Sequence, residues 1–279
     1  MKKPTIIWSL VLATMLGLFS CNDSSSPVIS INDDFVYPLS IGNSWSYDAT
    51  MSYSNISPDS IKDNFSDFTA KLIVSVTKKQ LIDTLNVFEI KEEGDEFAEA
   101  FAYYSNEDNG FLKHAYSYTP DIILPKTNSM KRFNFKEIYF NNIPEFIKKL
   151  KKTSILSKIF NDSIVYYEQP RVIFSYPLEV GNEWEFSTSY LKIFKEIIGK
   201  ETINTGFGNY SCYKIQWKYD LDSDGIVDDD FIYYEYLSSK GIIKRTLTIK
   251  KVAIMTIENP LGVGFADIEY KQILTNTNF

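Results

Sequence analysis

One short stretch of the chain concentrates oxygen ligands at a regular spacing. Residues 220–230 read DLDSDGIVDDD, so acidic side chains alternate before a glycine that lets the chain turn. The candidate ligands are the carboxylates of Asp220, Asp222, Asp224, Asp228 and Asp230 and the main-chain carbonyl of Ile226. Ca²⁺ binds roughly six to eight oxygen atoms in a flexible shell. The spacing predicts a structural Ca²⁺ site, and the alternative is a solvated acidic hairpin.

The segment resembles the EF-hand type of calcium loop, D-x-D-x-D-G-x-x-D. The resemblance implies that Val227, at the eighth position, points inward. At position twelve this sequence has Phe231 where the family has Glu, and Asp230 is the expected replacement. Aromatic strands are predicted on both sides of the loop, over 213–219 and 231–236, where the family has helices.

The first residues have the pattern of a secretion signal. A short positive segment precedes an apolar run from Ile6 to Phe19, which is too short for a comfortable membrane span. The run ends in LFSC, which resembles the lipobox of bacterial lipoprotein signals. The resemblance implies that residues 1–20 are removed and that Cys21 is acylated and anchors the protein in a membrane. The alternative is an ordinary cleaved signal that ends beside a chance cysteine.

Composition narrows the class of protein. Residues 21–34 are polar and serine-rich, which predicts a flexible tether before the folded part. The chain has 29 basic and 36 acidic residues, and without Lys2 and Lys3 the balance of 27 against 36 gives about −9. This acidic balance argues against a nucleic-acid partner. Nineteen Tyr and 20 Phe favour pleated strands with cross-strand aromatic pairs.

An internal duplication organises the chain. Residues 35–47 read FVYPLSIGNSWSY and residues 174–186 read FSYPLEVGNEWEF, with nine matches in 13 positions. The residue before proline is extended, and Gly-Asn favours a turn. The strand that follows is expected to bury Trp45 or Trp184 in the core of its unit, and the alternative is an aromatic platform for a ligand.

The repeat predicts a mainly β protein of antiparallel sheets. Its two units are 35–134 and 171–279, with a helical insert or linker at 135–170. The hairpin of the first unit that matches the acidic loop reads KEEGDE (91–96) and lacks its alternating Asp. The fold of the unit therefore does not require the loop of residues 220–230, and Ca²⁺ is expected to pin a long hairpin there.

The insert carries helical spacing and a basic cluster. Apolar residues after Asn142 recur at helical intervals, and a second helical stretch is predicted over Ser154–Phe160. The basic residues are Lys148, Lys149, Lys151 and Lys152. They form either a solvated face or a surface that lies against anionic lipid head groups.

Other reactive residues give weak signals. If Cys21 carries lipid, Cys212 has no cysteine partner, and we expect a small buried side chain over a reactive thiol. His114 is the one histidine, and we expect it at a solvent-facing strand end. The sequence has no nucleophile elbow, zinc-protease or phosphate-loop motif, so no catalytic residue is assigned.

The mature chain resembles uncharacterised Bacteroidetes lipoproteins that carry YPL-x-[VI]-G-N-x-W-x-[YF] segments. The resemblance implies an antiparallel β protein of the cell envelope, anchored in the outer membrane. The first functional hypothesis is a non-catalytic binding or assembly module for an envelope protein, a glycan or a hydrophobic ligand. The alternative is a polysaccharide hydrolase that uses an Asp/Glu pair about 5–10 Å apart.

Overall fold

The computed structural model describes most of the chain after residue 33. The described residues are 28–29, 34–82, 84–95, 97–117, 132–135, 138–140, 157–160, 164–187, 192–220, 224–256, 259 and 262–279. They form one 3-10 helix, η1 (Asp59–Asn64), and a 16-stranded sheet. The strands are β1 (Val28–Ile29), β2 (Ser44–Ser57), β3 (Phe68–Ile82), β4 (Leu85–Gly94), β5 (Phe97–Glu107), β6 (Gly110–Ser117), β7 (Arg132–Phe135), β8 (Ile138–Phe140), β9 (Ser157–Phe160), β10 (Ile164–Ser175), β11 (Glu183–Ser187), β12 (Lys192–Thr205), β13 (Gly208–Asp220), β14 (Phe231–Ser238), β15 (Gly241–Met255) and β16 (Gly264–Asn278). The prediction of a mainly β protein is confirmed.

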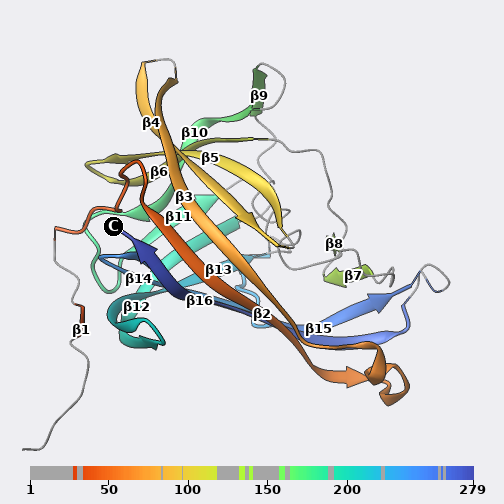
Figure 1. Ribbon diagram of the computed structural model, residues 1–279. Coiled ribbons are helices and arrows are strands. Elements are labelled where there is room, and N and C mark those ends of the chain that lie inside the picture. The colour runs from red at the N-terminus through yellow and green to blue at the C-terminus, as the bar shows by residue number, and fades with distance from the viewer. Residues whose placement is uncertain are drawn as a thin grey trace, which may run out of the picture.

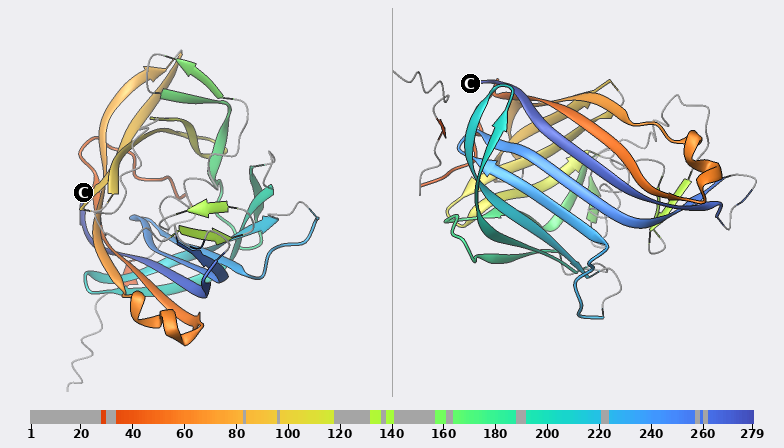
Figure 2. Two further views of the ribbon diagram at one scale, coloured as in Figure 1. Left: turned by 90° about the vertical axis from the view of Figure 1, so that its right-hand side faces the viewer. Right: turned by 90° about the horizontal axis from the view of Figure 1, so that it is seen from below.

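The strands belong to one strongly curved, mainly antiparallel sheet. Its main path is β11-β12-β13-β14-β15-β16-β2-β3-β4-β5-β6-β10-β9, and β1, β7 and β8 attach beside that path. Figures 1 and 2 show the sheet curling around a common interior, so that β10 and β11 approach each other. We call the side that faces this interior the inner face.

The path contains two consecutive meanders of the same order. β2 to β6 follow one another and β10 completes the first row, whereas β11 to β16 form the second row in chain order. β16 pairs along β2 and joins the two rows into one continuous sheet. The duplicated segments lead into β2 and β11, the first strand of each row. The unit boundaries drawn from the sequence remain predictions.

Both duplicated segments fold into the same turn. Gly42 and Gly181 have φ angles of +92° and +94°, a region that glycine enters without the Cβ strain of other residues. The matching hydrogen bonds are Gly42 N to Val76 O (2.9 Å) and Gly181 N to Ile197 O (2.8 Å), and Asn43 Nδ2 to Pro38 O (2.9 Å) and Asn182 Nδ2 to Pro177 O (3.0 Å). The asparagine amide thus ties the turn back to the proline carbonyl in each copy.

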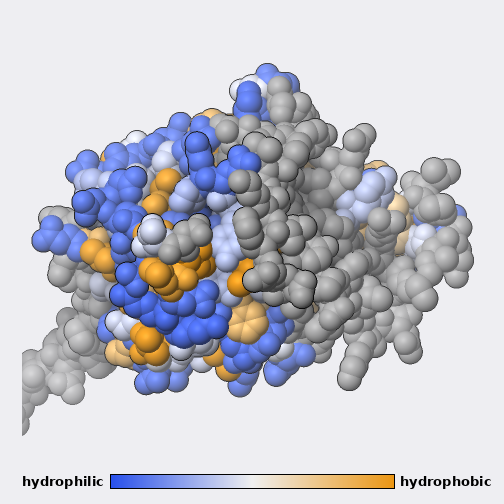
Figure 3. Space-filling view, turned by 90° about the horizontal axis from the view of Figure 1, so that it is seen from above, coloured by the Kyte–Doolittle hydropathy of each residue, from blue (hydrophilic) through white to orange (hydrophobic). Residues whose placement is uncertain are grey.

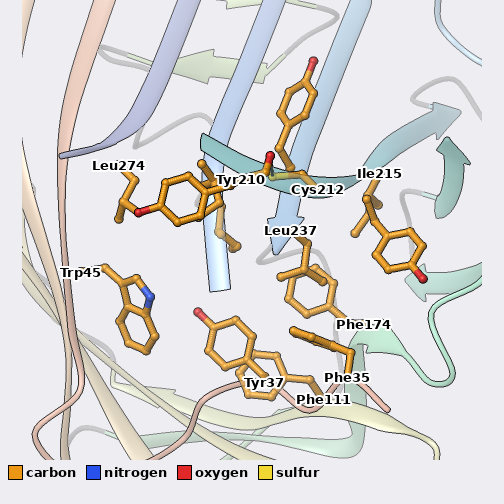
Figure 4. Close-up of a cluster of buried hydrophobic side chains, with 14 of the residues drawn as sticks. Phe35, Tyr37, Trp45, Phe111, Phe174, Tyr210, Cys212, Ile215, Leu237 and Leu274 are labelled. Carbon is orange, nitrogen blue, oxygen red and sulfur yellow. Dashed lines mark hydrogen bonds between the residues drawn. The ribbon is translucent and has the colours of Figure 1, made fainter. Parts of the chain in front are cut away.

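The tryptophans that follow these turns are buried, as predicted. Trp45 Nε1 donates to Lys240 O at 2.6 Å, which links the first unit to the β14–β15 turn of the second. Figure 4 shows Trp45 beside the aromatic group of Tyr37, Phe111 and Phe174. The Tyr37 and Phe111 rings stack at 4.2 Å between centroids. The core therefore draws its side chains from both units.

The two ends of the curved sheet are joined by side chains. Trp184 Nε1 donates to Val172 O at 3.2 Å, and Lys195 Nζ donates to Ile173 O at 3.1 Å. Within the described residues, β10 and β11 share no strand-pairing ladder. These two donors therefore bind carbonyls that a neighbouring strand would otherwise use. We call this junction the seam.

The insert between the units differs from its prediction where the structure describes it. Residues 157–160 form β9, which pairs antiparallel with β10, so the second helical stretch is wrong at these positions. β10 also begins inside the range assigned to the insert. The first helical stretch and its four lysines lie outside the described residues, as do Cys21 and the secretion signal.

Candidate functional site

The acidic loop after β13 is organised around one carboxylate. Asp220 is buried, and its Oδ1 and Oδ2 accept hydrogen bonds from the main-chain N–H groups of Asp224 (3.0 Å) and Gly225 (3.1 Å). Asp224 Oδ1 accepts from Ile226 N at 2.8 Å. Gly225 has a φ of +86°, which makes the turn. These bonds fold the loop back on its first residue.

The remaining predicted ligands are not drawn together by the structure. Asp222 lies outside the described residues, and within the described part of the chain no three Asp, Glu, His or Cys side chains surround a common point. Asp230 lies 3.8 Å from Lys251 Nζ. Val227 is 41% exposed and Ile226 is 70% exposed, so the inward position that the EF-hand resemblance implies for Val227 is wrong. The Ca²⁺ site stays a prediction.

A buried charged group on the inner face was missed at the sequence level. Glu235 Oε2 accepts from Lys195 Nζ at 2.9 Å and from Trp217 Nε1 at 2.8 Å. Its Oε1 accepts from Arg245 Nε at 3.1 Å. Lys195 and Glu235 are almost completely buried. Four consecutive strands, β12 to β15, therefore place these side chains around one carboxylate.

The group continues onto β16 through a glutamine. Arg245 Nη1 donates to Gln272 Oε1 at 3.3 Å, and Tyr270 Oη donates to the same oxygen at 3.4 Å. Burial raises the pKa of Tyr270 to about 12, so its hydroxyl stays protonated at neutral pH. Two cations and one anion thus meet in a largely aromatic surrounding, where unpaired charge is costly.

A sequence signal for this group did exist. Phe231, Tyr233 and Leu237 alternate along β14, and Glu235 falls in the same phase. A charged residue at an apolar position of a strand must be paired when it is buried. The strand alone does not reveal its partners, because Lys195 and Arg245 come from other strands.

A second buried carboxylate lies on β4. Glu89 Oε1 accepts from Thr77 Oγ1 at 2.7 Å, and Lys78 Nζ lies 3.1 Å from Glu89 Oε2. Both oxygens therefore have partners. Glu89, Glu235 and Asp220 are the buried carboxylates among the described residues, and each is held by its own donors.

His114 is buried, which corrects the expectation of a solvent-facing side chain. Its Nε2 lies 2.8 Å from Ser105 Oγ. The cause is an irregularity in pairing: Tyr103 opposes Ala115 and Tyr104 opposes Lys113, so His114 is the extra residue of a β-bulge. Burial lowers the pKa of His114 below its usual value, which favours the neutral ring at pH 7.

Cys212 is a buried thiol, as predicted. Burial raises its pKa to about 12. Because the thiolate is the reactive form, this cysteine is a packing residue and a poor nucleophile.

A shallow groove lies where the two duplicated segments meet. Tyr37 N donates to Tyr176 Oη at 2.9 Å, and Tyr176 Oη donates to Asn106 Oδ1 at 2.9 Å. The acidic residues that line the groove are Asp34, Glu107 and Asp108. The groove therefore has three carboxylate side chains in its lining.

The outer surface is mixed in character. Figure 3 shows mainly hydrophilic residues on the described part of one face, with apolar residues in small separate groups. Within the residues that the structure describes, no helix has the length and apolar character needed to cross a membrane.

Comparisons with known proteins give a weak structural likeness. The chain matches no protein-family model, and no curated protein matches it. One similar structure is a protein from Bacteroides fragilis described as exported and YmcC-like in fold, with a TM-score of 0.38, 13% identity, and coverage of 88% of this chain and 99% of that one. Another is a protein from Parabacteroides distasonis described as a lipoprotein, with a TM-score of 0.34, 10% identity, and coverage of 88% and 98%.

Proposed function

We propose that the protein is a non-catalytic binding or assembly module of the cell envelope, anchored in the outer membrane through lipid on Cys21. Its ligand or partner is an envelope protein, a glycan or a hydrophobic molecule. A structural Ca²⁺ ion pins the loop between β13 and β14. The lipobox sequence supports the anchor, and the alternating Asp residues support the ion.

The proposal of a non-catalytic role is supported by the buried carboxylates, whose oxygens all have donors from the protein. A general acid must hold a proton, and a carboxylate nucleophile must have a free oxygen directed at substrate. Glu235 has N–H donors on both oxygens, and so does Asp220, whereas Glu89 binds the Thr77 hydroxyl and the Lys78 ammonium. Each of these carboxylates therefore has both oxygens engaged by groups of the protein itself. The arrangement serves packing and cohesion.

The anchor is tested by Cys21→Ser in the producing bacterium. We expect wild-type protein in the membrane fraction, with acyl chains on the N-terminal peptide by mass spectrometry. The variant is expected in the soluble fraction, while Cys212→Ser stays in the membrane. If the Cys21→Ser variant stays in the membrane fraction without acyl chains, the proposed lipid anchor is wrong.

Calcium binding is tested by thermal melting of the full-length protein with EDTA or with Ca²⁺. A Ca²⁺ site with the affinity typical of extracellular modules is expected to stabilise the folded protein by about 1.4–2.7 kcal/mol at ~10 mM Ca²⁺. Asp222→Ala and Asp224→Ala are expected to lose this shift. Asp229→Ala in the same loop, which is no predicted ligand, is expected to keep it. Equal melting of the wild type with EDTA and with Ca²⁺ would contradict the site.

The structural feature that supports the hydrolase alternative is the groove lined by Asp34, Glu107 and Asp108. Release of reducing ends from envelope polysaccharides is the direct assay. We expect none from the wild type. Activity that disappears in Glu107→Gln or Asp108→Asn, but persists in Glu89→Gln, would replace the binding module by an enzyme.

A further inference from the structure

The inner face of the second unit buries charges that the strand order does not require. Its group consists of Lys195, Trp217, Glu235 and Arg245. The two units can be aligned by the residues that pair across adjacent strands, starting from Val76 and Ile197, which bind the two duplicated turns. In this alignment, the positions of the group correspond in the first unit to Val74, Glu92, Ala102 and Tyr116. The first unit thus builds the same strand order with uncharged side chains at three of these four positions. Forming the meander therefore does not require the charges of the second unit.

Two side chains, Arg245 and its neighbour Gln272, have N–H groups without a described acceptor. Arginine carries five N–H donors, and the described partners of Arg245 are Glu235 and Gln272, which bind Nε and Nη1. Gln272 is 2% exposed, and among the described residues its Nε2 donates to no acceptor. Its orientation is fixed, because Oε1 accepts from Arg245 and from Tyr270. An unpaired buried N–H is unfavourable, so a bound acceptor would stabilise the group.

The charge of Arg245 is only partly balanced. Among the described residues, the carboxylate in direct contact with Arg245 is Glu235, which also binds Lys195, and Glu92 adds a negative charge without a described ion pair to Arg245. Tyr37 and Tyr47 lie in the field of Arg245, but burial, the larger effect, raises the pKa of both above the usual value. Their hydroxyls are neutral at physiological pH and supply no negative charge.

Solvent reaches this part of the inner face. The Arg245 side chain is 19% exposed although it lies within the group. Glu92 follows Ile90 in the same strand phase, faces inward with it, and is exposed. The described ion pairs include none between Glu92 and Arg245. The exposed part of the Arg245 side chain is the place where a small group can approach it.

We propose that Arg245 and Gln272 bind an oxyanion, a carboxylate, phosphate or sulfate group of a ligand, on the inner face of the second unit. The guanidinium supplies charge and directional N–H groups, and the glutamine amide supplies a buried neutral donor beside it. The surrounding tyrosines would contact the uncharged part of the ligand. This site deepens the binding role proposed above and rests on it.

The test is melting of the full-length protein in detergent with sodium phosphate, sodium sulfate or sodium acetate. Sodium chloride at equal ionic strength is the reference for general salt effects. We expect at least one oxyanion to raise the melting temperature, and calorimetric titration to give a saturable Kd. A response to acetate alone assigns a carboxylate ligand, whereas a response to phosphate or sulfate assigns those groups.

The decisive variant is Gln272→Glu, which puts a carboxylate beside Arg245 in nearly the same volume. We expect it to melt at or above the wild-type temperature without ligand and to lose the oxyanion shift. Gln272→Met, which removes the unpaired donor, is a second variant that should also lose the shift. Lys271→Gln is the matched control, because it changes net charge equally on an exposed neighbouring position. It should keep the shift.

The proposal is overturned if no oxyanion exceeds sodium chloride, or if both Gln272 variants respond as the wild type does. A bound water alone would produce the first result. These outcomes are separate from the envelope role, since membrane anchoring and the absence of polysaccharide cleavage are measured in other assays. Cleavage of a polysaccharide would overturn that role and leave an oxyanion shift in place.

Discussion

The two units share a turn and differ in what they bury behind it. Gly42 and Gly181 adopt φ angles within a few degrees, and both bind the next strand through matching hydrogen bonds. Behind that turn, the first unit has Val74 where the second has Lys195, and Ala102 where the second has Glu235. The two units thus share the geometry of the turn and differ in the side chains of the inner face.

The same contrast separates the two acidic hairpins. In the first unit, β4 passes into β5 through a short turn after Gly94. In the second, residues 221–230 lie between β13 and β14, and Asp220 binds the main chain of the loop. A longer loop needs an internal anchor, because its main-chain groups have no ladder partners.

The largest expected effect compares the paired tryptophans. Trp45→Ala removes a fully buried ring and its bond to Lys240 O, which joins the units, so we expect a loss of about 5 kcal/mol. Trp184→Ala lies at the seam and should cost about 3 kcal/mol. Urea unfolding measures both. Equal losses would show that the link between the units adds nothing beyond ring burial.

The buried charges provide the next test. Glu235→Gln leaves Lys195 without its full counter-charge, and we expect a loss of about 3 kcal/mol in urea unfolding. Replacing the group together, with Lys195→Met, Glu235→Leu and Arg245→Met, should be close to neutral or stabilising. A large loss in the triple variant would mean that the second unit, unlike the first, folds through its charges.

The repeated turn gives a matched pair of smaller effects. A Cβ at Gly42 or Gly181 meets no atom within 4 Å, so alanine costs only the strain of positive φ. We expect about 1–2 kcal/mol at each position. The two values, measured by thermal melting, should agree. A clear difference would show that the two turns contribute unequally to stability despite their common geometry.

The smallest effect concerns acid stability in the first unit. The folded pKa of His114 lies below its unfolded value near 6.5, so the unfolded state binds a proton first as pH falls. Stability should therefore decline as pH drops through about 6.5 and level off below the folded pKa. His114→Asn should flatten this part of the profile, which denaturant melts at pH 5–8 would reveal. An unchanged profile would mean that the carboxylates alone govern it.

Local pattern predicted much of the fold, and contacts between distant strands explain the failures. The duplicated turn, the alternating strands, and the burial of Trp45 and Cys212 follow from short stretches of sequence. The position of His114 depends on a bulge, which changes the face of the side chain without a sequence mark. Residues 157–160 form a strand because β10 pairs with them, and a short apolar run does not decide between helix and strand.

The candidate site was least accessible from sequence. From sequence, Glu235 was recognisable only as a charged residue at an apolar position of its strand, and its charged partners are 40 residues earlier and 10 residues later in the chain. The unpaired amide of Gln272 becomes visible only when β15 and β16 are placed side by side. Pairing across four or more strands is a property of the assembled sheet.

The seam also bears on how molecules of this protein avoid polymerising. A sheet that stops short of closure usually presents free edges, which can recruit strands from other copies and start fibres. Here Trp184 and Lys195 already occupy the carbonyls of Val172 and Ile173. An incoming strand would have to displace an indole and a buried ammonium group before it could pair. The side chains at the seam thus protect this part of the edge against pairing with strands of other copies.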